Sequence, residues 1–565
     1  MFSHDILIVG GGLTGLRAAI EAADRGADVA LLSKIYPVRS HSDAAQGGIN
    51  AALGNNPAGH DDSPERHAYD TIKGSDFLAD QFAALVMAQD APARIIEAEQ
   101  WGTPFSRMHD GRIAQRPFGG AGFPRTCYAA DRTGHMLMHN LYEQVLKRDV
   151  KIYPEWQVLS LAVDEGRCHG LVALNRPTGE VAPFAAQAVI MATGGPGRVY
   201  ARTTNSITST GSGMALAYWA GAPLEDMEFI QFHPTTLYGT NILLSEASRA
   251  EGGYLLNNLG ERFMANYAHD FMELAPRDII CRAIQTEIDQ GRGFEGGTVL
   301  LDLRHLGEAK INERLPSVRE LAINYMGKDP VKEPIPVQPG EHYAMGGIDC
   351  NVDGETKVKG LYAAGECACV SVHGANRLGG NSLLETIVFG KRTGERAAHQ
   401  VKEEPLAPST KAVEAELARQ TERIAARCAV QMVGELGRIR AELRATMTDL
   451  VGVFRNGRDL ATALDKVREL QDRYRKAGVD CTHKIFNLDL ARGLELEGKL
   501  AVAEVIVAGA LARTESRGAH FRSDFPTRDD ANWLKHTLAH PTPTGPDFTY
   551  HSVEVTRFAV EAREY

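Results

Sequence analysis

The feature that most constrains this fold is a glycine-rich turn after the first apolar segment of the chain. Ile6–Val9 is a short continuous apolar run, which is typical of a strand buried on both faces. Gly10-Gly11-Gly12-Leu13-Thr14-Gly15 follows, and a helical pattern continues to about Arg25 before a second apolar strand over Val29–Leu32. Glycines at positions one, three and six of such a turn let the backbone approach a pyrophosphate, whose charge lies at the helix N-terminus. The sequence therefore predicts a Rossmann-like dinucleotide site.

The segments that follow indicate which dinucleotide binds. The second strand ends at Ser33-Lys34, where no Asp or Glu is present to hold a ribose hydroxyl, so a nicotinamide cofactor is disfavoured. Two later apolar runs also end in glycine turns: Ala188–Ala192 precedes Thr193-Gly194-Gly195, and Gly360–Ala364 precedes Gly365-Glu366. These junctions favour a flavin dinucleotide. They also predict one sheet that is assembled from separate segments of the chain.

The length of the chain requires more than one hydrophobic core, because 565 residues exceed what a single core supports. We expect an α/β fold with a discontinuous Rossmann-like FAD-binding domain over residues 1–235 and 343–402. An α+β capping domain, residues 236–342, is inserted between these two parts. A helical domain over 403–515 and a small C-terminal domain over 516–565 complete the predicted organisation.

The helical domain carries an apolar stripe. Leu460, Leu464, Val467 and Tyr474 recur with helical spacing between charged residues. Such a stripe is more typical of a packed satellite domain, and the alternative is a helical bundle that docks a partner.

Composition excludes several classes of protein and site. The formal net charge is −11 without long blocks of one sign, so nucleic acid is not expected as a partner. The eight cysteines are scattered without a CxxC pair, a pattern that predicts neither a zinc site nor an iron–sulfur cluster, and no metal site is expected. Charges interrupt every apolar run before the roughly 18 residues that a membrane span needs, and no secretory leader is expected.

Longer motifs then identify a family. Arg39-Ser40-His41-Ser42 runs into Ala45-Gln46-Gly47-Gly48-Ile49, and this segment resembles the flavoprotein subunits of succinate dehydrogenase and fumarate reductase, in which a histidine bonds covalently to the flavin. The resemblance continues in order along nearly the whole chain. The further matching segments are Gln231-Phe232-His233-Pro234-Thr235, Arg249-Ala250-Glu251-Gly252-Gly253, Pro276-Arg277-Asp278, His342-Tyr343-Ala344-Met345-Gly346-Gly347, Val372 to Ser382, and Ser516-Arg517-Gly518-Ala519-His520.

The resemblance implies FAD, attached covalently through His41. The family's Thr-Gly-Asp-Gly segment is Thr210-Gly211-Ser212-Gly213 here, so a flavin contact from that acid is not expected. The residues expected to contact the cofactor are Gly10, Gly12, Gly15, Ser33, Lys34, His41, Ala45, Gln46, Gly47, Gly48, Glu366, Ser382 and Leu383.

The same resemblance implies a dicarboxylate site made of His233, Ser245, His342 and Arg377. These groups suit a substrate with two carboxylates, because histidine and arginine hold both ends with charge-assisted hydrogen bonds. The family's catalytic arginine is matched to Arg282, with Glu246 and Arg249 completing a proton path. Because free arginine keeps its proton, that assignment requires a relay, and the alternative is a buried ion pair between Arg282 and Glu246.

The expected function is oxidation of succinate to fumarate by hydride transfer to covalent FAD, as the catalytic subunit of a succinate:quinone oxidoreductase. In the family that the chain resembles, succinate-oxidising members tend to carry Gln at the position of Gln46 and many fumarate reductases carry Glu, so the resemblance favours this direction. Physiological fumarate reduction at the same site is the alternative. L-aspartate oxidase is less favoured because its relatives lack the flavin-linking histidine. Adenylylsulfate reductase is disfavoured by the two-histidine dicarboxylate site. A non-catalytic flavin-binding scaffold is disfavoured because four site positions are intact: His233, His342, Arg377 and Arg282.

Partners follow from the resemblance. We expect an iron–sulfur subunit to accept electrons and hydrophobic membrane anchor subunits to meet a quinone. The predicted location is peripheral, on the cytoplasmic face of a bacterial inner membrane, where the partner subunits hold the protein.

Overall fold

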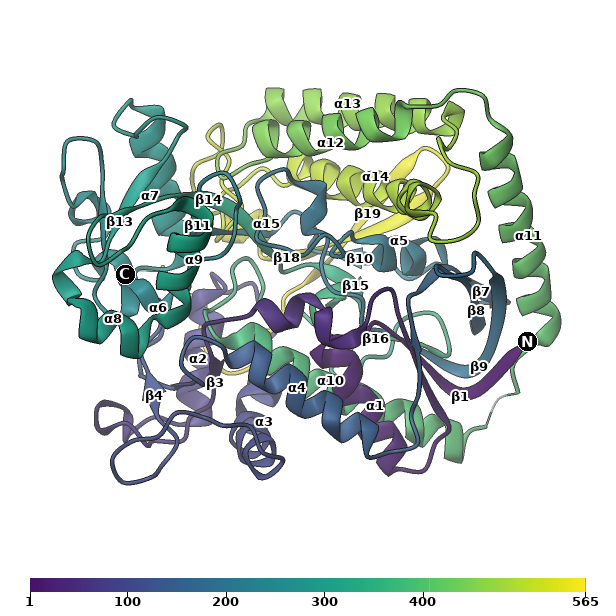
Figure 1. Cartoon of the computed structure of the whole chain (residues 1–565), viewed down its shortest axis with the longest axis horizontal. Coiled ribbons are helices and arrows are strands. Elements are labelled where there is room, and N and C mark those ends of the chain that lie inside the picture. The colour runs from purple at the N-terminus through teal and green to yellow at the C-terminus, as the bar shows by residue number, and fades with distance from the viewer. Residues whose placement is uncertain (406, 564–565) are drawn as a thin grey trace.

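The computed structural model describes residues 1–405 and 407–563. Its largest sheet has seven strands in the order β6-β2-β1-β9-β8-β7, with β16 also paired to β9. The helices α1 (Leu13–Asp24) and α10 (Asn381–Glu403) pack against each other beside this sheet (Figure 1). The strands of the sheet are β1 (Phe2–Val9), β2 (Val29–Ser33), β6 (Lys151–Pro154), β7 (Trp156–Asp164), β8 (Arg167–Asn175), β9 (Val181–Met191) and β16 (Leu361–Ala363).

The three strand-to-glycine junctions lie in this one sheet. β1 pairs in parallel with β9, which places Ile6 opposite Ala188, and β16 pairs in parallel with β9, which places Leu361 opposite Val189. Because the three strands run in the same direction, their glycine turns all meet at the carboxyl edge of the sheet. The prediction of one sheet built from separate segments is confirmed.

The capping region forms its own sheet and its own core. Four strands pair in the order β11-β14-β13-β12, and a separate cluster of buried apolar residues, including Leu255 and Ile284, packs beside them. The predicted limits at 236 and 342 fall inside β11 and β14, because both strands continue without a break from the FAD-binding region into the cap. The elements are β11 (Ile230–Leu237), α6 (Ala247–Ala250), β12 (Tyr254–Leu256), α7 (Arg277–Asp289), β13 (Val299–Asp302), α8 (Glu308–Arg314), α9 (Pro316–Met326) and β14 (Ile335–Ala344).

The helical region contains α11 (Thr410–Ala429), α12 (Glu435–Leu450), α13 (Gly457–Lys476) and α14 (Leu488–Ala512). In the predicted stripe, Leu460, Val467 and Tyr474 are buried, and Leu464 packs partly buried against the same core. The helix α13 packs against both α12 and α14, and α12 and α13 lie at the top of Figure 1. The stripe therefore faces the inside of a packed domain.

The C-terminal segment does not fold apart from the rest. Its strands β18 (Lys535–Thr542) and β19 (Gly545–Ser552) extend a five-stranded sheet whose order is β17-β15-β10-β18-β19. The other members come from earlier in the chain: β10 (Leu224–Glu225), β15 (Gly347–Asp349) and β17 (Ala368–Cys369). The predicted C-terminal domain thus shares a sheet with strands from both sides of the cap.

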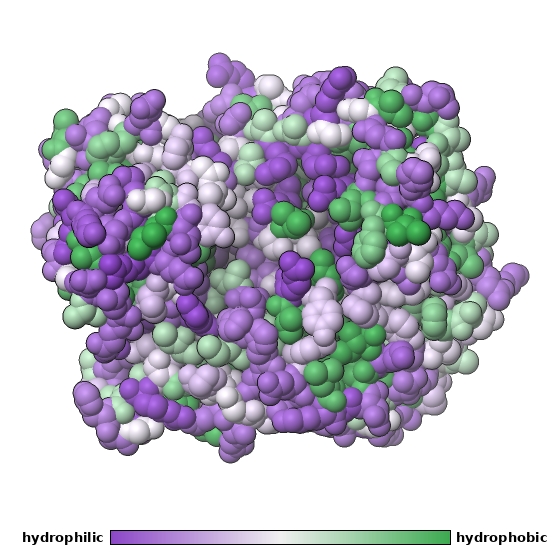
Figure 2. Space-filling model, in the orientation of Figure 1, coloured by the Kyte–Doolittle hydropathy of each residue, from purple (hydrophilic) through white to green (hydrophobic). Residues whose placement is uncertain are grey.

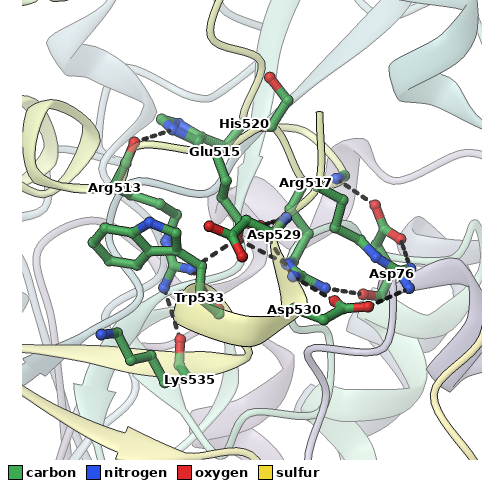
Figure 3. A network of polar contacts seen from close by, with 12 residues as sticks. Asp76, Arg513, Glu515, Arg517, His520, Asp529, Asp530, Trp533 and Lys535 are labelled. Carbon is green, nitrogen blue, oxygen red and sulfur yellow. Dashed lines mark hydrogen bonds and ion pairs between the residues drawn. The ribbon is translucent and has the colours of Figure 1, made fainter. Parts of the chain in front are cut away.

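A buried network of charges fastens this segment in place (Figure 3). The Arg513 guanidinium donates to Glu228 at 2.7 Å and to Glu515 at 3.0 Å. Arg517 donates to both oxygens of Glu515, at 2.8 and 3.0 Å, and to the backbone oxygen of Asp76 at 3.0 Å. Removing one partner would leave a buried charge unpaired, which is strongly destabilising. The network therefore couples the C-terminal segment to the FAD-binding region.

Among residues 1–405 and 407–563, no helix has the length and apolar character needed to cross a membrane. Figure 2 shows hydrophilic side chains over most of one face, with apolar side chains in separate groups.

Candidate active site

Gly10, Gly12 and Gly15 in the first turn are each glycine for a different local reason. Gly10 has φ +118°, and a Cβ atom on it would lie 2.1 Å from the Ala192 carbonyl oxygen. A Cβ atom on Gly15 would lie 1.9 Å from the Gly10 carbonyl oxygen, so only glycine lets α1 pack this closely on the turn. At Gly12 the nearest atom to such a Cβ is the Ser42 hydroxyl at 3.2 Å. Gly12 thus leaves the N-terminus of α1 open to the adjacent groove.

This groove is a cavity of about 150 Å³ that is lined by the glycine turn, Ser33, Lys34, Ser212 and Glu366. The residues fit a flavin dinucleotide. The helix N-terminus suits a pyrophosphate, and the buried Thr193 hydroxyl in the groove wall has no hydrogen-bond partner in the described part of the chain. Lys34 does not offer a free charge, because its Nζ donates to the Thr208 carbonyl at 2.9 Å and is paired with Glu495.

A second cavity, of about 250 Å³, opens from the first at His41, Ser42, Glu366 and Thr386, which line both. The predicted residues that line the second cavity are His41, Ala45, Gln46, Gly47, Gly48, His233, Ser245, Glu246, His342, Glu366, Arg377, Ser382 and Leu383. Residues that the sequence did not single out as site residues also line it, among them Phe118, Thr204 and Arg277. The predicted cofactor and dicarboxylate sites are therefore adjacent.

Two histidines in contact with each other line this cavity. The rings of His233 and His342 have centroids 5.0 Å apart. The Nδ1 of His233 accepts a hydrogen bond from the backbone N–H of Thr235 at 3.2 Å, and the Nδ1 of His342 lies 2.8 Å from the Thr204 hydroxyl. Burial, followed by the positive charge of Arg277, holds the pKa of both imidazoles well below the usual range. Both rings are thus neutral near pH 7, and the proton of His233 is on Nε2, the nitrogen that Thr235 leaves free.

Two arginines complete the polar wall. Arg377 is buried, its guanidinium lies 4.4 Å from the centre of the Tyr343 ring, and it donates to Gln231 Oε1 at 3.0 Å. Arg277 donates to the same amide oxygen, also at 3.0 Å. Burial and the neighbouring Arg277 lower the pKa of Arg377 to about 10. The Gln231 amide therefore positions both guanidinium groups. The sequence showed Gln231 only as part of a matching motif.

Glu246 is the carboxylate of this wall. Its Oε2 accepts two hydrogen bonds from Arg277, at 2.9 and 2.7 Å, and its Oε1 accepts from the Gly119 backbone N–H at 2.8 Å. Arg249 is also buried, with its guanidinium 3.8 Å from Glu246 Oε2. Burial alone would raise the pKa of Glu246, but Arg277 and Arg249 outweigh burial and lower it. With Arg377 nearby, positive charge is in surplus around this carboxylate.

The prediction that Arg282 reaches the site is wrong. Its side chain donates to the Gly518 carbonyl at 3.0 Å and to Asp278 at 2.9 Å, and it lies over the Phe521 ring. Arg282 therefore does not form the alternative ion pair with Glu246 either. Arg277 takes that place, since it lies in the first turn of α7. The five-residue separation carries Arg282 well past one helical turn and onto another face of the helix. The matching Pro276-Arg277-Asp278 segment was the signal that could have identified Arg277.

His41 lies where the two cavities meet. Its Nδ1 accepts a hydrogen bond from the Ser206 backbone N–H at 3.3 Å, which leaves Nε2 as the nitrogen available to a ligand. Burial, aided by Arg198, lowers the pKa of His41 to about 4, so the imidazole is neutral near pH 7. Glu366 faces the same junction, and burial, followed by the nearby Glu341, raises its pKa to about 8. At neutral pH, Glu366 is mostly a neutral carboxyl that can donate a hydrogen bond.

Gln46 and Ser245 place polar groups in the second cavity. Gln46 donates from Nε2 to the Leu243 carbonyl at 3.3 Å, while its buried Oε1 has no hydrogen-bond partner in the described residues. The Ser245 hydroxyl accepts from the Ala247 backbone N–H at 3.2 Å and keeps its own proton for a ligand. Both side chains line the second cavity.

Comparison with known proteins gives the family. Residues 5–383 match the family model described as FAD binding domain, and residues 440–565 match the model described as Fumarate reductase flavoprotein C-term. The FAD-binding match supports FAD as the cofactor.

Curated relatives cover nearly the whole chain. The chain is 46% identical over 583 residues to the fumarate reductase flavoprotein subunit of Mycobacterium tuberculosis, covering 100% of this chain and 99% of the relative. It is 44% identical over 559 residues to the succinate dehydrogenase flavoprotein subunit of Rickettsia bellii, covering 95% and 92%.

Similar solved structures belong to the same family as these relatives. A variant of Escherichia coli quinol fumarate reductase matches with a TM-score of 0.96 and 42% identity, covering 100% of this chain and 98% of that chain. A quinol-fumarate reductase solved with menaquinol matches with a TM-score of 0.95 and 42% identity, covering 99% and 100%. Adenylylsulfate reductase from Archaeoglobus fulgidus, at 20% identity and a TM-score of 0.79, shares the fold. Fold, cavities and relatives together show that this chain is a flavoprotein oxidoreductase subunit of the succinate dehydrogenase and fumarate reductase family.

Proposed function

We propose that this protein interconverts succinate and fumarate at a covalently bound FAD and that succinate oxidation is its physiological direction. The observation that carries the proposal is the second cavity, where two neutral histidines and buried arginines with surplus positive charge open onto the dinucleotide groove. When bound, FAD supplies hydride acceptance, which no side chain of the protein can provide.

The polar wall suits a four-carbon diacid. His233 can donate from Nε2, Ser245 can donate its hydroxyl proton, and Arg377 brings a charged donor to the same cavity. Charge-assisted hydrogen bonds of this kind bind carboxylates strongly. Holding both ends of the substrate fixes which C–H bond faces the flavin site, and such orientation lowers the barrier by several kcal/mol.

Arg277 is the residue that we assign to proton transfer. Its guanidinium lines the cavity on one side and bonds Glu246 on the other. Because arginine does not stay deprotonated near neutral pH, Arg277 passes its proton to Glu246 as it takes one from the substrate carbon. Arg249, behind Glu246, stabilises the carboxylate between transfers.

We propose that His41 Nε2 is the site of covalent attachment. The Ser206 N–H holds Nδ1 as an acceptor, and a ring that is substituted on Nε2 keeps that lone pair. The lowered pKa of His41 keeps the ring neutral, which a nucleophilic nitrogen requires.

The proposed physiological direction, succinate oxidation, depends on Gln46. Its amide is neutral, whereas a carboxylate at this place would add negative charge beside the flavin and make electron acceptance harder. Physiological fumarate reduction is the second candidate, because relatives named fumarate reductase are among the most similar proteins. L-aspartate oxidase remains less favoured, and an assay for iminoaspartate formation from aspartate tests it.

We further propose that an iron–sulfur subunit accepts the electrons and that membrane anchor subunits connect it to a quinone. The solved quinol-fumarate reductases similar to this chain support an assembly of this kind. The proposed location is peripheral, on the cytoplasmic face of a bacterial inner membrane.

The test begins with acid precipitation of the purified flavoprotein. Yellow fluorescence should stay with the wild-type polypeptide and should be released from the His41→Ser variant, which keeps FAD without the bond. The native protein should then reduce an artificial acceptor with succinate, faster than it reduces fumarate with a reduced dye. Free flavin from mature wild-type protein would refute covalent attachment, and inactivity with both diacids would refute the reaction.

A further inference from the structure

The segment that carries His41 also carries an acidic residue that faces two histidines of a neighbouring helix. His41–Ala44 forms a short 3-10 helix, and Asp43 lies in its middle. The helix α4 (Thr133–Leu146) packs against it and presents His135 and His139, four residues apart on one face. None of these three residues lines either cavity that the proposed function uses.

The packing of α4 on this segment is tight at one residue. A Cβ atom on Gly134 would lie 2.3 Å from the Ser42 carbonyl oxygen, and the Gly134 N–H donates to the Ala45 carbonyl at 2.8 Å. Only glycine allows the start of α4 to approach this closely. The positions of the two histidines relative to Asp43 are therefore set by the backbone.

The ligand atoms of Asp43, His135 and His139 lie within 4.8 Å of one another. Asp43 Oδ1 is 2.9 Å from His135 Nδ1 and 3.9 Å from His139 Nε2, and the two rings have centroids 4.4 Å apart. In a tetrahedral zinc site with bonds of about 2.0–2.1 Å, ligand atoms lie about 3.3 Å from one another. The observed separations lie on both sides of that value, so small side-chain rotations suffice to close the site.

We propose that Asp43, His135 and His139 form a binding site for one divalent first-row transition ion, such as Zn²⁺. Imidazole and carboxylate ligands suit these ions, whereas Mg²⁺ and Ca²⁺ prefer oxygen ligands alone. The three side chains are one-third to one-half exposed, which leaves room for water in the fourth position.

A bound ion would join the His41–Ala44 segment to α4 by bonds stronger than the present hydrogen bond. Because Asp43 is two residues from His41, the ion restrains the backbone that positions the imidazole at the junction of the cavities. The structure thus predicts that Zn²⁺ slows amide hydrogen exchange in residues 41–45 and 133–139.

The test is a titration of the full-length, metal-stripped flavoprotein with Zn²⁺ against a chromogenic chelator. One Zn²⁺ per chain should bind, and His135→Ala and His139→Ala should each weaken binding at least about tenfold, because loss of even an outer-shell partner of a metal ligand typically costs about 10- to 100-fold in affinity. His269→Ala is the matched control, because His269 lies 3.1 Å from Asp270 in an exposed pair without a second histidine. This control should bind Zn²⁺ as tightly as the wild type does.

Two results would overturn the proposal. One is the absence of stoichiometric Zn²⁺ binding to wild-type protein, and the other is tight binding that persists in a His135→Ala/His139→Ala double variant. If that variant folds poorly, as judged by its melting temperature, the exposed His139→Gln change replaces it. Addition of Mg²⁺ in place of Zn²⁺ should leave the exchange rates of both segments unchanged, and equal slowing by Mg²⁺ would also refute the site.

Discussion

Arg277 and Glu246 share two hydrogen bonds, of 2.9 and 2.7 Å, that both end on the same carboxylate oxygen in the wall of the second cavity. A third guanidinium nitrogen of Arg277 donates to Gln231. The guanidinium is thus held on two sides while it also lines the cavity. This arrangement gives the proton relay a fixed starting geometry, because neither partner needs to reorient before a transfer.

Replacement of Arg277 tests the relay. Arg277→Lys should lower turnover by about 10²–10⁴-fold, the usual contribution of one general acid–base group, because a lysine cannot bond Glu246 and face the substrate at once. Stopped-flow reduction of the bound flavin by succinate measures the step. The flavin should remain attached, since Arg277 does not line the dinucleotide groove.

Arg282→Lys is the matched control for that experiment. Both arginines lie on α7, but Arg282 bonds Gly518 and Asp278 away from the cavity. The Arg282 variant should therefore reduce its flavin at nearly the wild-type rate. A large loss in Arg282→Lys together with full activity in Arg277→Lys would show that the geometry assigns the wrong arginine.

Ser245 should contribute to diacid binding. Ser245→Ala removes a donor to a substrate carboxylate, and a hydrogen bond to a charged group is worth about 1.5–3 kcal/mol. The dissociation constant of a non-reacting diacid such as malonate should rise by about 10- to 100-fold, as measured from the flavin absorbance. Ser248→Ala, which changes a buried hydroxyl outside the cavity, should bind malonate normally. Equal weakening in both variants would point to a structural effect.

Gln46→Glu should change the preferred direction. A carboxylate in this cavity adds negative charge beside the flavin and lowers its reduction potential. The ratio of fumarate reduction to succinate oxidation should therefore rise by about tenfold or more, since about 1.4 kcal/mol suffices for that factor. Assays in both directions on one preparation measure the ratio. An unchanged ratio would remove Gln46 as a determinant of direction.

Stability should depend on pH through the fully buried His67. Burial, aided by Arg125, lowers its pKa from 6.5 to about 3, although a hydrogen bond to Asn381 raises it. Between these values the unfolded chain binds a proton that the folded protein excludes, so stability falls as the pH falls, by up to about 1.4 kcal/mol per pH unit. Melting temperatures at about pH 7 and about pH 5 should therefore differ less in His67→Gln than in wild type. Equal differences would contradict the assignment.

Many residues that line the two cavities could be predicted from the sequence because their geometry is local. The turn from Gly10 to Gly15 joins neighbouring elements, so its spacing alone specifies the backbone approach. His41 and Gln46 likewise lie in one short segment that lines the second cavity. The order of glycine junctions also predicted the discontinuous sheet, since parallel strands bring their carboxyl ends to one edge.

The features of the site that could not be predicted from the sequence depend on long-range packing. Arg282 and Arg277 lie on one helix, and only the docking of α7 against β11 decides which of them faces the cavity. The Gln231 amide joins two arginines from distant segments, and no spacing pattern records such a contact. The predicted limits of the cap fall inside β11 and β14, so no turn marks the boundary that the sequence had to place.

The buried contact between Asp278 and Arg563 has a consequence for how the protein is made. Arg563 donates to both oxygens of Asp278, at 3.0 and 2.7 Å, and Asp278 follows Arg277 on α7. These partners are 285 residues apart in the chain, so a ribosome translates the helix long before it translates its anchor. In a nascent chain whose cap has already folded, α7 therefore lacks its contact with Arg563. We therefore expect that truncation before Arg563 makes α7, and with it Arg277 in the polar wall of the second cavity, less firmly held. Cellular proteases should then reach α7, even though every residue of the cavity is present.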